Sequence, residues 1–505
     1  MATLFAFAIS GFCRKTNPFL APLPLGEEAR NERVRAERSE EIMRQTPSLR
    51  SALTRQLHRC AVALPPSPRG RGFYFAIIVA LTTFARAELS YPPKLADRKT
   101  VVTDTSDAFI KRNEAIAKDV DVARTAPTID FMYCPKQTYV GNPWSVWGDG
   151  LAIKGKYYSA IGDHTGPRGN AFVFEYDPAR KTMRTIVDVQ SVLNLPEGHY
   201  TPGKIHSRID MGRDGHLYFS THRGSTRVTT DEYHYKGDWI LQHDLAKGKT
   251  NIIAQGPVPK HCIPTGLLDP DRLIFYGGTA SGALGEKNVM FFAYDIAKRK
   301  VLHTAPNGPY RYLIFAKSSG RVYYVNEDNG PLMRYDPKSG KLPKQIDGSI
   351  GLRSATLETP DGYVYTVSTR RDGTIWRFNT KTEKIEKIGN VAVGARTYVT
   401  SIDADPTGRY LYYTPGAHGG AEQDGTPIVQ FDTKTRRKKI IAFLFPFYRD
   451  KYGYTPIGTF ASAIDSKGEK LYVTWNGNRE GPDKRGRYRF DTCAMTVIHI
   501  PESER

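Results

Sequence analysis

A repeated unit of about 40 to 50 residues is the feature that most limits how this chain can fold. Each unit has an apolar run, a Gly/Asp turn, a run centred on Tyr or Phe, a loop, and two further strand-like runs. Clear copies are SGRVYYVNEDNGPLMRYDPKSGK and DGYVYTVSTRRDGTIWRFNTKTEKIEKI. Four short strands per unit, recurring at this period, are typical of a β-propeller.

Seven copies are counted from the aromatic residue at the centre of the second run. These aromatic residues are Tyr158, Tyr218, Phe275, Tyr323, Tyr365, Tyr412 and Tyr472. We therefore expect an all-β fold, a seven-bladed β-propeller of four-stranded blades over residues 145–501, with residues 88–144 as an N-terminal extension that packs on it. A β-sandwich would not explain seven units, and no unit ends in the Trp-Asp pair of WD40 repeats.

The stretch before residue 88 contains the parts of a secretory signal. Residues 1–72 are charged or rich in Pro and Gly, so we expect them to be disordered or to precede a true translation start near residue 70. Residues 73–87 follow a basic RGRG and combine an apolar run with an A-x-A ending. The run is short for a bilayer span, so we predict a secreted or periplasmic protein with no stable membrane span. A membrane anchor behind a cytoplasmic tail is the open alternative.

The net charge indicates which kind of partner the protein binds, and the cysteine content limits the disulfides that it can form. The formal net charge is +20, and most of it lies after residue 100. This excess favours an anionic partner, and export favours an acidic oligo- or polysaccharide over nucleic acid. Cys134, Cys262 and Cys493 are the cysteines that follow the signal. They allow at most one disulfide, with Cys134 and Cys493 as a candidate pair that would tie the ends of the mature domain together.

Counting from the central aromatic places corresponding residues of all blades in register. In a propeller the first strand lines the channel and the second returns beside it, so the start of one and the end of the other share a face. Twelve residues before the aromatic stand Val146, His206, Ile263, Arg311, Arg353, Thr400 and Phe460. Four to six residues after it stand His164, His222, Thr279, Glu327, Thr369, His418 and Asn476.

Histidines gather at this predicted mouth. Five of the twelve fall there, namely His164, His206, His222, His261 and His418. Tyr310 and Arg396 lie close to the same ring of positions, beside Arg311 and Arg353. A single histidine at a strand end is usually structural, but their shared placement predicts a functional site.

The residue types favour an acidic ligand. Arginine forks pair with carboxylate or sulfate, and a histidine near neutrality can move a proton. A divalent metal ion is also compatible, with His261, His418 and Glu327 as candidate ligands, although no local metal motif is present. A glycosidase would need paired acidic residues, and this ring offers only Glu327.

The blade pattern over residues 145–501 resembles that of virginiamycin B lyase-type propellers and of the propeller polysaccharide lyases that act on ulvan or oligogalacturonate. KIHSRIDMGRDGHLYFSTHRG is the segment that most suggests it. The resemblance implies β-elimination on a uronate, with His and Tyr performing the chemistry and Arg or a metal ion neutralising the carboxylate.

Carried over to this sequence, the resemblance implies His206 and His222 as candidate base and partner, and Arg311 or Arg353 as the neutralising residue of a carbon-oxygen lyase. From the ring of positions we also expect His164 as a catalytic residue and Arg311, Arg353, Tyr310 and Arg396 as substrate-binding residues, and we expect a monomer. No complete family motif assigns the base. A noncatalytic extracytoplasmic propeller that binds a glycan or a protein is the alternative. A quinone-dependent dehydrogenase is disfavoured because its Trp-rich blade motifs are missing.

Overall fold

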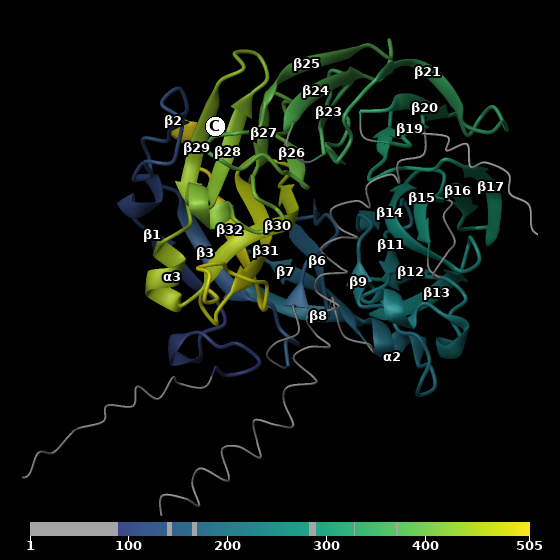
Figure 1. Ribbon diagram of the computed structural model, residues 1–505, viewed down its shortest axis with the longest axis horizontal. Coiled ribbons are helices and arrows are strands. Elements are labelled where there is room, and N and C mark those ends of the chain that lie inside the picture. The colour runs from purple at the N-terminus through teal and green to yellow at the C-terminus, as the bar shows by residue number, and fades with distance from the viewer. Residues whose placement is uncertain (1–88, 139–143, 164–168, 282–288, 328, 370–371) are drawn as a thin grey trace, which may run out of the picture. The chain divides into compact units, whose positions relative to one another are not determined.

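The computed structural model describes residues 89–138, 144–163, 169–281, 289–327, 329–369 and 372–505. All of them lie in one compact unit, Arg86–Arg505. Within it, seven small sheets stand around a ring, which confirms the seven-bladed β-propeller (Figure 1). Across the described residues, no helix is long and apolar enough to cross a membrane.

Each blade starts with a short strand at the channel. In the first two blades this strand is broken into two pieces that pair with the same neighbour. The channel strands are β4 (Trp144–Ser145), β5 (Leu151–Ile153), β9 (Lys204–Ile205), β10 (Asp210–Met211), β14 (His261–Asp269), β18 (Ile314–Ala316), β22 (Ser354–Ala355), β26 (Ile402–Ala404) and β30 (Thr455–Ile464).

The second strand of each blade is antiparallel to the first. These strands are β6 (Lys156–Asp163), β11 (Leu217–His222), β15 (Ile274–Ser281), β19 (Arg321–Val325), β23 (Tyr363–Val367), β27 (Tyr410–Tyr413) and β31 (Lys470–Asn478). All seven aromatic residues used to count the repeat lie on them, and each is at most 2% exposed. The aromatic rings therefore pack between neighbouring blades, where removing apolar area from water stabilises the ring.

The turn between the first two strands needs an unusual backbone. Gly215 and Gly362 have φ of 80° and 81°, a conformation that costs glycine little. This explains the Gly/Asp turns of the repeat. The turns all lie at the end of the channel opposite the starts of the channel strands.

The third and fourth strands complete the blades. The third strands are β7 (Ala171–Asp177), β12 (Trp239–Asp244), β16 (Met290–Asp295), β20 (Pro331–Tyr335), β24 (Thr374–Asn379), β28 (Pro427–Asp432) and β32 (Thr492–His499). The outer strands of the first six blades are β8 (Thr182–Asp188), β13 (Lys249–Gln255), β17 (Lys300–Pro306), β21 (Lys344–Ser349), β25 (Ile385–Asn390) and β29 (Lys438–Phe443).

The stretch before the first blade supplies the outer strand of the last one. β3 (Thr128–Tyr133) pairs with β32, and β1 (Val102–Thr105) pairs with β3. β2 (Asp121–Val122) runs parallel to β29 in the sixth blade. Part of residues 88–144 is thus built into two sheets, and the ring is closed by segments from both ends of the described chain.

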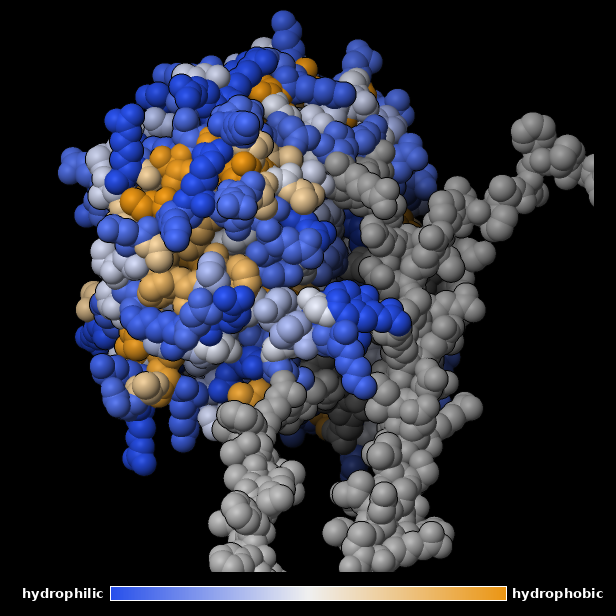
Figure 2. Space-filling model, turned by 60° about the vertical axis from the view of Figure 1, so that its left-hand side comes forward, coloured by the Kyte–Doolittle hydropathy of each residue, from blue (hydrophilic) through white to orange (hydrophobic). Residues whose placement is uncertain are grey.

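Short helices fill the connections. They are η1 (Ala96–Arg98), η2 (Asp107–Ile110), α2 (Val189–Leu193), η3 (Thr226–Val228), η4 (Asp231–Tyr233), η5 (Ala421–Asp424), α3 (Phe447–Tyr452) and η6 (Glu502–Glu504). Figure 2 shows one face on which hydrophilic residues predominate and hydrophobic residues gather in small groups. A largely hydrophilic surface of this kind suits contact with a polar partner.

The three cysteines of the described residues are buried and unbridged. Cys134 and Cys493 are neighbours across the closing strands, where the Cys134 amide donates a hydrogen bond of 3.2 Å to the Cys493 carbonyl. The candidate pair therefore meets at the ring closure as two thiols.

Candidate functional site

Five rings come together where the channel strands begin, and we call this cluster the histidine mouth. It consists of Trp147, His206, His222, His418 and Phe460. Trp147 and His206 follow the short strands β4 and β9, His222 ends β11, His418 lies in the loop after β27, and Phe460 lies within β30. Segments from four blades therefore contribute to one cluster, which includes His206, His222 and His418 of the positions found by the register count.

The rings of the histidine mouth touch in a continuous series. The His206 and His222 ring centroids are 5.5 Å apart, edge to face. His206 stacks on Trp147 at 6.0 Å, and Trp147 lies 4.7 Å from Phe460. His418 reaches Phe460 at 5.1 Å from the other side. Two imidazoles in contact can serve as proton donor and acceptor for one ligand.

Arg353 brings a fixed positive charge to the same mouth. It immediately precedes β22 and is only 5% exposed. Its guanidinium lies 5.4 Å from the Phe460 ring and 5.5 Å from the Tyr398 ring, and its Nε donates a hydrogen bond of 2.6 Å to the Tyr398 hydroxyl. Within the described part of the chain, its two Nη groups make no hydrogen bond. This half of the guanidinium fork can meet a carboxylate.

Tyr398 contacts both Arg353 and His418. Its ring stacks on that of His418, with centroids 4.8 Å apart. His418 is exposed and Tyr398 half-buried, whereas His222 is buried. The site thus runs from an open rim into the channel.

The register count missed three residues of this mouth. Lys204 is 3% exposed, with its Nζ 4.3 Å from the centre of the Trp147 ring. Lys204 and Tyr398 each stand two residues before a register position, His206 and Thr400. Extending the count by two residues would have found both. Trp147, one residue after Val146, gives no such signal.

The other predicted catalytic and substrate-binding residues are placed differently. His164 lies outside the described residues. The Arg311 guanidinium lies 5.0 Å from the centre of the Tyr310 ring, in the segment before β18. The Arg396 side chain donates a hydrogen bond to Gln423 on η5. Of the four predicted substrate-binding residues, Arg353 contacts a ring of the histidine mouth, that of Phe460.

The three metal candidates do not form one group. His261, at the start of β14, has its Nδ1 2.9 Å from the Thr279 hydroxyl. His418 belongs to the histidine mouth. Glu327 is exposed in the loop after β19. Their placement offers no common ion position.

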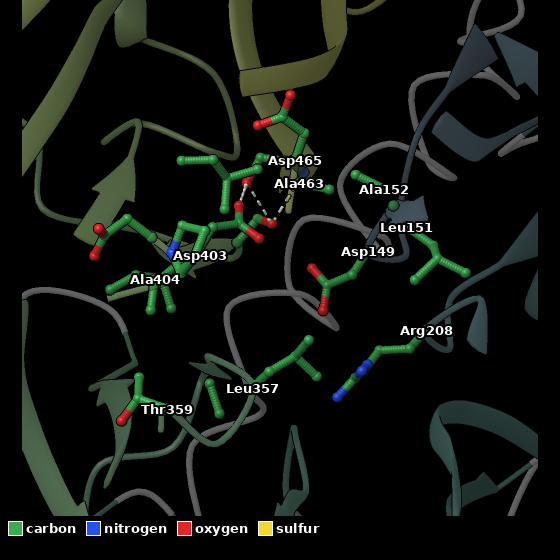
Figure 3. A pocket seen from close by; sticks show the side chains of 18 of the residues that line it. Asp149, Leu151, Ala152, Arg208, Leu357, Thr359, Asp403, Ala404, Ala463 and Asp465 are labelled. Atoms are coloured by element: carbon green, nitrogen blue, oxygen red, sulfur yellow. Dashed lines mark hydrogen bonds between the residues drawn. The ribbon is translucent and has the colours of Figure 1, made fainter. Parts of the chain in front are cut away.

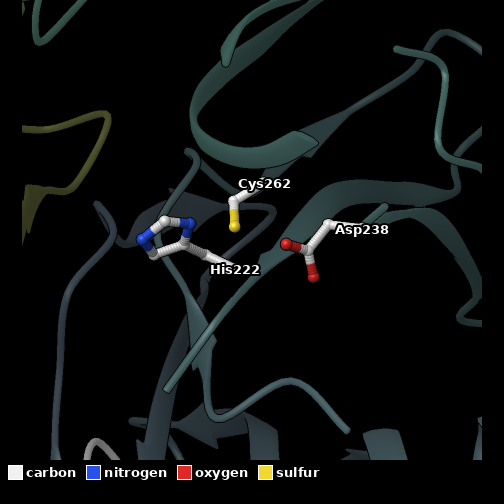
Figure 4. A group of neighbouring side chains, drawn as sticks. All are labelled: His222, Asp238 and Cys262. Carbon is white, nitrogen blue, oxygen red and sulfur yellow. The ribbon is translucent and has the colours of Figure 1, made fainter. Parts of the chain in front are cut away.

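A different trio brings metal-binding atoms together. His222, Asp238 and Cys262 each offer one ligand atom, and these atoms lie within 4.8 Å of one another. Figure 4 shows the Cys262 sulfur between the imidazole and the carboxylate. The sequence did not reveal this trio because Asp238 precedes β12 and Cys262 lies on the next blade.

Hydrogen bonds hold the trio in place. Asp238 Oδ1 accepts from the Tyr200 hydroxyl at 2.9 Å and from Thr221 at 2.8 Å. Burial raises the pKa of Asp238 to about 6. Burial also raises the pKa of Cys262 to about 11, while the neighbouring Arg223 opposes the rise.

Nitrogen, oxygen and sulfur donors at these distances fit a zinc ion, which binds the deprotonated thiol. The Arg223 Nη1 group, 3.2 Å from the Cys262 sulfur, favours that thiolate. The trio can therefore hold one divalent ion next to the histidine mouth, since His222 belongs to both.

Comparisons with known proteins add no family to this geometry. No family model matches the chain, and no curated protein matches it.

Solved structures match at low identity. An oligogalacturonate lyase in complex with manganese is 12% identical, with a TM-score of 0.46 over 80% of this chain and 98% of that one. A catalytically inactive virginiamycin B lyase from Staphylococcus aureus with quinupristin is 10% identical, with a TM-score of 0.44 over 73% and 98%. The RRP9 WD40 repeats are 10% identical, with a TM-score of 0.43 over 72% and 100%. Such matches carry no argument about activity, and the fold assignment rests on the strand topology.

Proposed function

We propose that the protein is a lyase that cleaves an acidic polysaccharide by β-elimination at the histidine mouth. The observation that carries the proposal is the position of Arg353, which is buried, is fixed by Tyr398 and packs on Phe460, the ring that also contacts His206 of the His206–His222 pair. A uronate carboxylate bound there would face imidazoles that can transfer its neighbouring proton.

The chemistry explains why these groups belong together. A base removes the proton on the carbon next to the carboxylate, the bond from the adjacent carbon to the glycosidic oxygen breaks, and a carbon-carbon double bond forms. The departing oxygen takes a proton from an acid. The negative charge that builds up on the carboxylate needs a fixed positive partner, and Arg353 supplies it. His206 and His222 are the candidate base and its partner.

A divalent ion at His222, Asp238 and Cys262 is part of the proposal. Such an ion would supply a positive charge next to His222. The chain's own part is to hold the ligands, with Asp238 fixed by Tyr200 and Thr221, and an ion-bound His222 would keep one ring orientation.

We also propose that the protein works outside the cytoplasm as a monomer. A polysaccharide substrate is found there, and residues 73–87 carry the pattern of an export signal. Most of the positive excess lies after residue 100, and it would attract an acidic polymer over a distance of about a Debye length.

The test is incubation with a panel of uronate polysaccharides while the ultraviolet absorbance of the unsaturated product is followed. We expect His206→Ala to abolish product formation and Arg353→Ala to cost about 2 to 4 kcal/mol in kcat/KM. Arg449→Ala is the matched control, because this arginine lies on α3 and pairs with Asp450 at 2.8 Å. Its activity should equal that of the wild type.

Absence of product from every uronate polymer would contradict the lyase assignment. If one of the polymers still bound, and Arg353→Ala weakened its binding, the mouth would belong to a noncatalytic glycan-binding propeller.

A further inference from the structure

The channel has a second opening, at the end opposite the histidine mouth. A cavity of about 380 Å³ lies there, between the ends of channel strands β5, β26 and β30 and the loop after β22 (Figure 3). Apolar side chains form much of its wall, among them Leu151, Leu357, Ile402 and Ile464. The histidine mouth uses none of these residues.

Two carboxylates face each other across this cavity. Asp149 and Arg208 lie on one side, and Asp403 lies on the other, on β26 (Figure 3). Asp149 accepts a hydrogen bond from the Tyr312 hydroxyl. Arg208 donates to Asp210 at 2.8 Å, so part of its charge is already used.

The carboxylates at the rim of this cavity already accept hydrogen bonds from the protein. Glu358 accepts hydrogen bonds from Ser318, Asp405 from the Tyr410 amide, and Asp465 from the Lys470 amide. These bonds fix the loops around the opening. They leave the deeper carboxylates as the groups that a ligand would meet.

Asp403 is the carboxylate that can still accept further hydrogen bonds. Among the described residues, its one side-chain hydrogen bond comes from the Ser462 hydroxyl, to Oδ2. Burial raises the pKa of Asp403 to about 7, and the negative charge of Asp149 adds to the rise, which outweighs the opposing effects of the Ser462 hydroxyl and the Arg208 charge. The protein alone therefore compensates this negative charge poorly, and a cation in the cavity would complete it.

We propose that this cavity binds a small organic cation with a primary ammonium group, with Asp403 as its counter-ion and the apolar wall around its aliphatic part. An ammonium group offers three donors, which suit one carboxylate and nearby hydroxyls. A calcium or magnesium ion needs several oxygen ligands, and here the rim carboxylates are taken and Arg208 stands beside Asp149.

Calorimetric titration of the full chain with propylammonium and pentylammonium tests the proposal, with 1-pentanol, pentanoate and calcium ions as the comparison probes. We expect the amines to bind, the longer one more tightly, and the comparison probes to give no heat. Asp403→Asn should abolish amine binding. Asp465→Asn is the matched control, since this rim carboxylate is already bonded, and it should bind as the wild type does.

A second measurement on the wild type does not depend on a variant. Amine affinity should fall at least about tenfold between pH 8 and pH 5.5, because Asp403 takes up a proton over this range. No heat with either amine, equal affinity for 1-pentanol, binding of calcium alone, or unchanged affinity in Asp403→Asn would overturn the proposal. Uronate cleavage is measured separately, so failure of one proposal leaves the other standing.

Discussion

One hydrogen bond decides how Arg353 presents its charge. Its Nε donates to the Tyr398 hydroxyl at 2.6 Å, so the guanidinium plane is held beside the Tyr398 and Phe460 rings. A buried arginine without such a partner would lose this orientation. Tyr398 is therefore a positioning residue for Arg353.

We expect Tyr398→Phe to lower kcat/KM for the uronate substrate by about 10- to 100-fold, the scale of a hydrogen bond to a charged group. The aromatic ring and its stacking on His418 remain, so the melting temperature should stay near that of the wild type. Tyr410→Phe, at the far end of a second strand, is the control and should keep full activity. Equal activity in both variants would show that Tyr398 does not orient Arg353.

A second prediction at the scale of residues concerns the candidate metal ligands His222, Asp238 and Cys262. Purified protein reconstituted with zinc should hold about one ion per chain, measured by elemental mass spectrometry. Cys262→Ala should lose it, because the thiolate is the strongest of the three ligands. Cys493→Ala, a buried cysteine at the ring closure, should keep it. A wild-type protein that retains no zinc would contradict the site.

At the scale of elements, β3 is the strand that the seventh blade takes from the N-terminal side. Phe131 on this strand is fully buried and packs against Tyr448 at 4.7 Å and Tyr454 at 5.5 Å. These rings join the strand to α3 and to β30. The outer strand of this blade is thus held by its own hydrophobic contacts as well as by the ladder to β32.

Phe131→Ala should lower the free energy of unfolding by about 3 to 5 kcal/mol, because it leaves a cavity in this aromatic cluster. Chemical denaturation measures the change. Leu342→Ala is the control, since Leu342 is 58% exposed, and it should change stability by less than about 0.5 kcal/mol. A similar small effect of Phe131→Ala would show that β3 contributes little to the closed ring.

At the scale of the whole molecule, Asp130 joins the two sides of the ring closure. Its carboxylate lies 2.9 Å from Nε2 of His499 on β32, and it accepts from Lys181 at 2.7 Å and Thr103 at 2.5 Å. Lys181 belongs to the first blade and His499 to the last. Burial alone would raise the pKa of Asp130, but these hydrogen bonds outweigh it and lower the pKa to about 2.

The free energy of unfolding should therefore depend on pH through the ionisation of Asp130. The pKa of Asp130 is lower in the folded chain than in the unfolded one, so its contribution is complete above about pH 4 and is lost as the pH falls toward 2. Asp130→Asn should cost about 1 to 2 kcal/mol at pH 7, a value reduced by the half-exposed Lys181, and little near pH 2. A cost that is equal at both pH values would contradict this role of the ionised carboxylate.

Much of the fold could be predicted because its signal is local. Tyr323 and Tyr365 are centres of alternating runs, and burying their rings determines which face of each strand turns inward. The same alternation brought His206, His222, His418 and Arg353 to one mouth. The register count gives Arg353 and Arg311 the same position, so it could not predict that their guanidinium groups lie over different rings. Arg353 directly precedes β22, whereas Arg311 lies three residues before β18, and this small difference sends its guanidinium over Tyr310 instead.

The sequence by itself determined the number of blades, the register of the second strands and the end of the channel at which histidines gather, because these follow from strand alternation and turn chemistry. Tertiary structure alone decided that Thr128–Tyr133 joins the last blade, that Asp238 and Cys262 meet His222, and that Asp149 faces Asp403 across the second opening. Each of these depends on contacts between segments distant in sequence. Packing of one blade on the next, and closure of the ring, bring such segments together, and no local sequence pattern records either.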